Sequence, residues 1–119
     1  MSSHEEASIA LFAYGSLRQP EVQRAKFGRL LEGRPDALPG FVLAPLTITD
    51  PGVVATSGAA VHKIARRTGN AADLVPGLVF AITAAELEAA DNYEVDAYTR
   101  VHIRLASGSE AFVYVAAEA

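Results

Sequence analysis

Residues 9–17 read Ile-Ala-Leu-Phe-Ala-Tyr-Gly-Ser-Leu, an apolar run that stops at a glycine. Such a run is typical of a buried β-strand that ends in a turn. Gly15 permits unusual φ angles and lets a ligand approach the main chain. The N–H groups of Gly15, Ser16 and Leu17 could then form an anion-binding nest. A strand followed by a turn that merely needs glycine gives the same pattern, so this stretch leaves both interpretations open.

On either side of this stretch, short strand-like and helix-like segments follow one another. Pro20–Leu31 predicts a short helix that Gly28 interrupts. The S/T-x-x-E pattern at 83–86 is a capping box and predicts a second short helix over 86–93. Apolar and β-branched stretches predict strands at 38–44, 45–49, 59–64, 75–82, 98–106 and 111–116, with a polar loop at 66–73 and a turn at 107–108.

These elements predict an α+β fold with two short helices around a small mixed β-barrel or a strongly curved sheet. Residues 1–8 are polar and acidic, and we expect a flexible lead-in there. Residues 9–119 contain no repeat and no boundary, so we expect one domain.

Composition narrows the class of protein. The chain has 119 residues, of which 50% are hydrophobic and 20% charged, as in a globular domain. Its net charge of −4 argues against a nucleic-acid surface, which needs clustered basic residues. The beginning of the sequence lacks the basic-then-apolar order of a signal peptide, and no apolar run approaches the ~20 residues of a membrane span. We therefore expect a cytoplasmic protein with no membrane partner.

A second candidate for chemistry is Glu94, at the end of the later helix. Its apolar neighbours, including Tyr93 and Tyr98, would raise its pKa toward that of a useful general base. A solvated carboxylate at a helix end is the alternative. Arg100 shares a strand face with Tyr98 and could pair with Glu94 or with a ligand carboxylate, although the spacing alone favours an ordinary surface arginine.

Other chemistries find less support. The chain has no cysteine, which excludes disulfides, thiolate ligands and a cysteine nucleophile. His62 and His102 have no partner at metal-ligand spacing, so we expect no metal site and no cofactor. Ser16 does not lie in a G-x-S-x-G elbow.

Taken together, the motifs resemble the γ-glutamylcyclotransferase-like superfamily, in particular its small bacterial proteins and γ-glutamylamine cyclotransferases. The family opens with an apolar strand into Y-G-[ST]-L, followed by a Pro-Gly-aromatic segment and a V-x-G-x-[VIL]-[YF]-x-[IL] strand. A short helix ending in L-D-x-[YF]-E, a Y-x-R strand and a closing hairpin come next. In this chain the matching segments are 14–17, 39–41, 75–82, 91–94, 98–100 and 113–115.

The resemblance implies an enzyme that cleaves a γ-glutamyl amine or γ-glutamyl amino acid. In the family the Y-G-[ST]-L loop holds the γ-glutamyl group through its backbone amides, which implies substrate binding at Tyr14–Leu17. The family's glutamate is the acid/base catalyst, which implies Glu94. The substrate's α-amine attacks its own γ-carbonyl, and 5-oxoproline and an amine are released. Tyr98, Arg100 and Tyr114 are possible pocket residues.

Two alternatives stay open at this stage. A non-catalytic module of the same fold would bind a small carboxylate or amide without turnover, and a related amide hydrolase would release an open-chain acid. Segments 45–58 and 64–75 are expected to form the pocket rim but match no substrate-defining pattern, and His62 has no assigned role. Family likeness does not fix the substrate, and the composition does not indicate an oligomeric state.

Overall fold

A computed structural model of the chain describes residues 7–47, 51–52, 55, 61–94 and 97–117. The elements, in chain order, are β1 (Ile9–Ala13), the 3₁₀ turn η1 (Ser16–Arg18), α1 (Pro20–Phe27), β2 (Gly33–Pro39), β3 (Phe41–Thr47), β4 (Val61–Arg67), β5 (Leu74–Ile82), α3 (Ala84–Tyr93), β6 (Tyr98–Arg104) and β7 (Glu110–Ala116).

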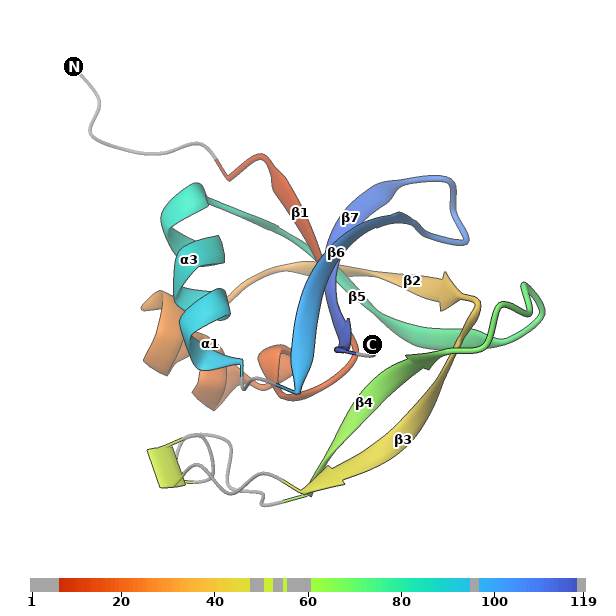
Figure 1. Cartoon of the computed structure of the whole chain (residues 1–119). Coiled ribbons are helices and arrows are strands. Elements are labelled where there is room, and N and C mark those ends of the chain that lie inside the picture. The colour runs from red at the N-terminus through yellow and green to blue at the C-terminus, as the bar shows by residue number, and fades with distance from the viewer. Residues whose placement is uncertain (1–6, 48–50, 53–54, 56–60, 95–96, 118–119) are drawn as a thin grey trace.

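The strands form two sheets. The larger has five strands in the order β2-β5-β1-β7-β6, and β3 and β4 form a separate antiparallel pair. The central strand β1 is antiparallel to β5 and parallel to β7, so the sheet is mixed. Helices α1 and α3 pack against each other on one side of this sheet, while the β3–β4 pair extends away from it (Figure 1). The predicted α+β class is confirmed, but the described strands form open sheets with no closed barrel.

The apolar run of β1 reflects burial on both faces. Leu11 and Ala13 pack in one hydrophobic cluster with the residues of α3, and Phe12 packs in a second cluster on the opposite face with Phe41 and Val113. The exposed fractions of Leu11 and Phe12 are 0% and 1%. A strand covered on both faces is apolar throughout, because neither face meets water.

Gly77 lets β5 approach β1 closely. A Cβ atom at this position would lie 2.5 Å from the Ala13 carbonyl oxygen and 2.6 Å from the Cζ atom of Phe12. Real Cβ atoms essentially never come this close to other atoms, so only glycine fits without displacing β1. The glycine therefore helps to fix the end of β1, from which the Tyr14–Leu17 loop begins.

The predicted boundary between two strands near Pro45 is wrong. The chain turns instead at Gly40, whose φ of 83° is left-handed and favours glycine, and β3 continues through Pro45. Since β3 pairs only with β4 among the described strands, it is an edge strand, where a missing N–H is tolerated. Parts of the strands expected at 45–49 and 59–64 lie outside the described residues.

Both helices end or begin as their sequences indicate. Helix α1 stops at Phe27, and Gly28 follows in the left-handed conformation with φ of 71°. At the start of α3, the Thr83 hydroxyl accepts a hydrogen bond from the Glu86 N–H, and the Glu86 carboxylate accepts one from the Thr83 N–H. The predicted capping box is confirmed.

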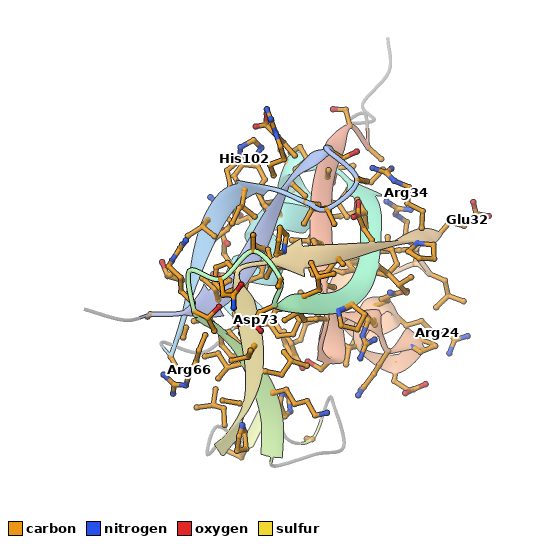
Figure 2. The ribbon with its side chains drawn as sticks, turned by 90° about the vertical axis from the view of Figure 1, so that its right-hand side faces the viewer. Arg24, Glu32, Arg34, Arg66, Asp73 and His102 are labelled. Carbon is orange, nitrogen blue, oxygen red and sulfur yellow. The ribbon has the colours of Figure 1, made fainter. Side chains whose placement is uncertain are left out.

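Several charged side chains lie at the periphery. Figure 2 shows Arg24 and Arg66 extending outward, away from the ribbon. In the described part of the chain, no helix has the length and apolar character needed to cross a membrane.

Candidate active site

A small cavity lies where β1 ends. Its free volume is about 20 Å³, which admits one water-sized group. The residues that line it are Phe12, Ala13, Tyr14, Gly15, Ser16, Leu17, Lys63, Glu94, Tyr98 and Tyr114. The structure therefore brings the Tyr14–Leu17 loop and Glu94 to one place, although Glu94 follows Leu17 by 77 positions in the sequence.

A wider hollow adjoins this cavity and has a volume of about 470 Å³. The two spaces share Tyr14, Gly15, Ser16 and Lys63. The hollow also includes Arg18, Gln19, Pro20, His62 and Leu78. A molecule that places one small group in the cavity would extend into this hollow.

The loop after β1 presents main-chain N–H groups. The carbonyls of Gly15 and Ser16 accept from the N–H groups of Arg18 and Gln19 and so form the short turn η1. The N–H groups of Ser16 and Leu17 come at the start of this turn, where no earlier carbonyl of the turn can accept from them. They are the donors by which the loop could hold an anion or a carbonyl oxygen.

Gly15 does not have a positive φ angle, and the space where its side chain would lie is open. Its φ is −125°, so the expected unusual φ angle is not found. A Cβ atom at Gly15 would meet no heavy atom within 4 Å. The absence of a side chain leaves the main chain accessible from the cavity and the hollow, as close approach by a ligand requires.

Tyr14 has a structural hydroxyl group. The hydroxyl donates to the Tyr114 carbonyl oxygen at 2.6 Å and accepts from the Ala65 N–H at 2.9 Å, so it ties β1 to both β7 and β4. Leu17 is only 4% exposed and packs in the core. Tyr14 and Leu17 therefore have no free polar side-chain group to offer a ligand. They can contribute to a site only through their main chain or, for Tyr14, through its ring.

Ser16 and Tyr93 connect the loop to helix α3. Their hydroxyl oxygens lie 2.8 Å apart in a hydrogen bond. Tyr93 is the last residue of α3 and directly precedes Glu94. This bond therefore holds the loop next to the candidate catalytic carboxyl group.

Glu94 is the C-cap residue of α3, and its N–H donates to the Ala90 carbonyl oxygen at 3.1 Å. Its side chain is partly buried in the cavity wall. Burial raises the pKa of Glu94 to about 8, because a low-dielectric setting disfavours the charged form. A carboxyl group with this pKa can exchange a proton near neutral pH.

Three tyrosines surround this carboxyl group. Burial raises the pKa of Tyr14, Tyr98 and Tyr114, and the negative charge of Glu94 raises each of them further. The Tyr98 hydroxyl donates to the Lys63 carbonyl oxygen at 3.1 Å. The phenols therefore stay protonated at neutral pH and cannot serve as bases.

Arg100 does not lie where the sequence interpretation places it. Its Nη1 atom is 2.7 Å from the Oδ2 atom of Asp91, and its guanidinium lies 5.0 Å from the centre of the Phe112 ring. Asp91 also accepts a hydrogen bond from the Tyr114 hydroxyl at 2.6 Å. Arg100 therefore pairs with Asp91 of α3 and not with Glu94. It is absent from the cavity wall.

Lys63 and His62 line the hollow, although sequence analysis assigned no role to either residue. The packing of β4 against β7 and the hydrogen bond from Ala65 to Tyr14 bring these residues to the end of β1, and no local pattern in the sequence indicates these contacts. None of residues 64–75, expected at the pocket rim, lines either space, and much of the other expected rim segment, 45–58, lies outside the described residues. His102 lies elsewhere, 3.5 Å from a Glu110 oxygen. Among the described residues, no group of histidines and carboxylates is arranged to hold a metal ion.

A family model matches this chain, and solved structures share its fold. Residues 11–119 match the family model of gamma-glutamyl cyclotransferase, AIG2-like. The fold is similar to the crystal structure of the uncharacterized protein PH0828 from Pyrococcus horikoshii, with a TM-score of 0.63 and 16% identity over 94% of this chain and 80% of that chain. It is also similar to the solution structure of At3g28950.1 from Arabidopsis thaliana, with a TM-score of 0.67 and 23% identity over 98% of this chain and 66% of that chain. No curated protein matches the sequence significantly.

Proposed function

This chain belongs to the gamma-glutamyl cyclotransferase, AIG2-like family, and on that premise we propose that it converts a γ-glutamyl amine or γ-glutamyl amino acid into 5-oxoproline and a free amine. One observation carries the proposal. A carboxyl group whose pKa burial raises to about 8 shares a water-sized cavity with a loop that offers main-chain N–H groups. A proton acceptor and a carbonyl-binding surface are the two parts that this reaction needs.

The size of the cavity suggests what enters it. An amine nitrogen is about as large as a water molecule, so the cavity of about 20 Å³ suits the substrate's α-amine. Glu94 would then lie beside the nitrogen that must lose a proton. The rest of the γ-glutamyl group follows the Gly15–Ser16 main chain into the wider hollow.

In the proposed reaction Glu94 first accepts a proton from the α-ammonium group. The freed amine attacks the γ-carbonyl carbon, and a C–N bond forms to close the five-membered ring. The bond between that carbon and the leaving nitrogen then breaks as Glu94 returns the proton to this nitrogen. Glu94 next removes the second proton from the ring nitrogen, which leaves the neutral lactam, and passes it to the released amine, which departs as an ammonium ion. The loop N–H groups would stabilise the oxygen of the tetrahedral intermediate. Holding the chain folded supplies much of the acceleration, since well-oriented intramolecular reactions reach effective molarities on the order of 10⁵ M or more.

The neighbouring phenols support Glu94 as the acid/base group. Tyr14, Tyr98 and Tyr114 have raised pKa values, with burial as the main cause, and remain uncharged. Glu94 is the acidic group of the described cavity wall that titrates near neutral pH. A group that relays protons from one nitrogen to the other needs a pKa close to the working pH.

The experiment measures 5-oxoproline by mass after incubation with a panel of γ-glutamyl amines and γ-glutamyl amino acids. Glu94→Gln should lose about 10²–10⁴-fold in rate, with its fold checked by circular dichroism. Glu88→Gln is a matched control, because Glu88 is exposed on the same helix and lines neither space. It should keep the wild-type rate.

Other products or patterns would contradict the proposal. Glutamate in place of 5-oxoproline would indicate an amide hydrolase. Binding of γ-glutamyl compounds without turnover would indicate a binding module. Equal rates for the wild type and Glu94→Gln would show that another group moves the proton.

A further inference from the structure

The wider hollow next to the cavity has a basic lining. Arg18 and Lys63 carry positive charge there, and His62 adds an imidazole. No acidic side chain of the described residues lines this hollow, in a chain whose net charge is −4. The basic character is therefore local, and general composition does not account for it.

The basic residues are fixed close to the loop. The Nε atom of Arg18 donates to the Gly15 carbonyl oxygen at 3.3 Å, which holds the guanidinium beside the main chain of the loop. The Lys63 carbonyl oxygen accepts from the Tyr98 hydroxyl at 3.1 Å, and this bond anchors the backbone of Lys63 at the cavity. Both side chains are exposed, so a ligand can reach them.

Position decides which part of a substrate meets these charges. The cavity and the hollow share Tyr14, Gly15, Ser16 and Lys63. If the α-amine lies beside Glu94, the γ-carbonyl lies along the shared loop, and whatever is attached to it projects into the hollow. The attached part is the leaving amine.

We propose that the hollow binds the leaving amine and selects one that carries a carboxylate group, the size of an amino acid or a dipeptide. This inference rests on the proposed cyclotransferase function. A volume of about 470 Å³ lies within the usual range for small-molecule sites and is far larger than ammonia or methylamine needs. Arg18 and Lys63 attract a carboxylate, and Arg can bind it through two parallel hydrogen bonds. A leaving group with a second cationic amine meets like charges there.

The test compares substrates that differ only in that carboxylate. The first is a γ-glutamyl amino acid, the second is the same compound with its leaving-group carboxylate converted into a carboxamide, and the third is a γ-glutamyl diamine. We expect kcat/KM for 5-oxoproline release to be about tenfold higher for the first than for the second at low ionic strength, and lower still for the third. Added salt should reduce the ratio, because exposed charges are screened.

Two variants test whether the hollow causes the preference for a leaving-group carboxylate. Lys63→Gln and Arg18→Gln should each lower the carboxylate-to-carboxamide ratio of kcat/KM by about threefold or more. Arg104→Gln removes the same charge from a residue whose side chain is 73% exposed and that lines neither space. It should leave the ratio unchanged.

The outcomes separate this inference from the proposed function. Equal kcat/KM values for the carboxylate and the carboxamide, with 5-oxoproline formed from both, would overturn the inference and leave the cyclotransferase standing. An equal loss on both substrates in Lys63→Gln and Arg18→Gln would overturn it too, because the cations would then hold the glutamyl carboxylate. Absence of 5-oxoproline from every substrate would refute the proposed function and the inference with it.

Discussion

Replacing Glu94 by glutamine should stabilise the fold in alkaline solution and change it little at pH 4. Burial raises the pKa of Glu94 from 4.5 to about 8. Between these two values the folded protein holds a proton that the unfolded chain has released. The free energy of unfolding of the wild type therefore falls as the pH rises from about 4.5 to about 8. Glutamine has no such proton, so the variant lacks this loss.

The size of the effect follows from the shift and the exposure. At about 1.36 kcal/mol per pH unit, the difference between 4.5 and about 8 would amount to about 5 kcal/mol for a group held away from water. Glu94 is only partly buried, and a water molecule fits in the cavity beside it. Solvation of the carboxylate reduces the free-energy cost of ionising it in the folded protein. We therefore expect Glu94→Gln to raise the free energy of unfolding by about 1–3 kcal/mol at pH 9. In a domain of this size that is a rise in Tm of about 4–12 °C.

Thermal unfolding at pH 4, 7 and 9 measures this gain. The Tm difference between Glu94→Gln and the wild type should grow from pH 4 to pH 9. Glu88→Gln, on the exposed face of the same helix, should show no comparable growth. Parallel Tm curves for Glu94→Gln and the wild type, or a variant less stable at pH 9, would refute the reasoning, because Glu94 would then be solvated as an ordinary surface carboxylate.

Four further predictions concern the proposed base and its supports. The kcat/KM for 5-oxoproline release should rise with pH up to about 8 and then level off, because this parameter reports the pKa of the base in the free enzyme. A fall between pH 6 and 8 would contradict a base with that pKa. Gly77→Ala should cost about 1–3 kcal/mol in urea unfolding, because the new Cβ meets the backbone of β1, and an unchanged midpoint would show that β1 moves freely. Gly15→Ala should change the free energy of unfolding by less than about 1 kcal/mol, since its Cβ meets nothing within 4 Å. It should nevertheless lower kcat/KM, because the new methyl group occupies space beside the loop main chain. Full activity would show that substrate does not approach the loop. Asp91→Ala should cost about 1–3 kcal/mol, because the Tyr114 hydroxyl loses its acceptor. Arg100→Ala removes an exposed ion pair and a cation–π contact with Phe112 and should cost less, about 1 kcal/mol. Equal costs would assign the whole effect to the contacts of Arg100.

The sequence predicts those elements that are determined by residues close to one another along the chain. The apolar run of β1, the capping box at Thr83, the stop of α1 at Gly28 and the β6–β7 hairpin are each decided by residues a few positions apart. Hydrophobic periodicity and capping depend on such short spacings. These elements could therefore be located from the sequence.

Features that depend on packing between distant strands could not. The position of Lys63 at the cavity depends on β4 lying against β7, and the partner of Arg100 depends on how near Asp91 comes to the hairpin. The tolerance of Pro45 inside β3 depends on that strand being at an edge. None of these relations leaves a periodic signal in one sequence, whereas the meeting of the Tyr14–Leu17 loop with Glu94 was implied by the family resemblance.

The segment Asp91–Glu94 explains why the site is difficult to dissect by mutation. Within one turn of α3, Asp91 holds the β6–β7 hairpin through Tyr114, Tyr93 holds the loop through Ser16, and Glu94 enters the cavity wall. The same turn therefore fixes the sheet, the loop and the carboxyl group relative to one another. A change at Asp91 or Tyr93 would alter stability and activity together, because it moves the parts that Glu94 must meet. Glu94→Gln keeps the shape and the neighbouring bonds, so it is the substitution in this turn that separates proton transfer from the architecture around it.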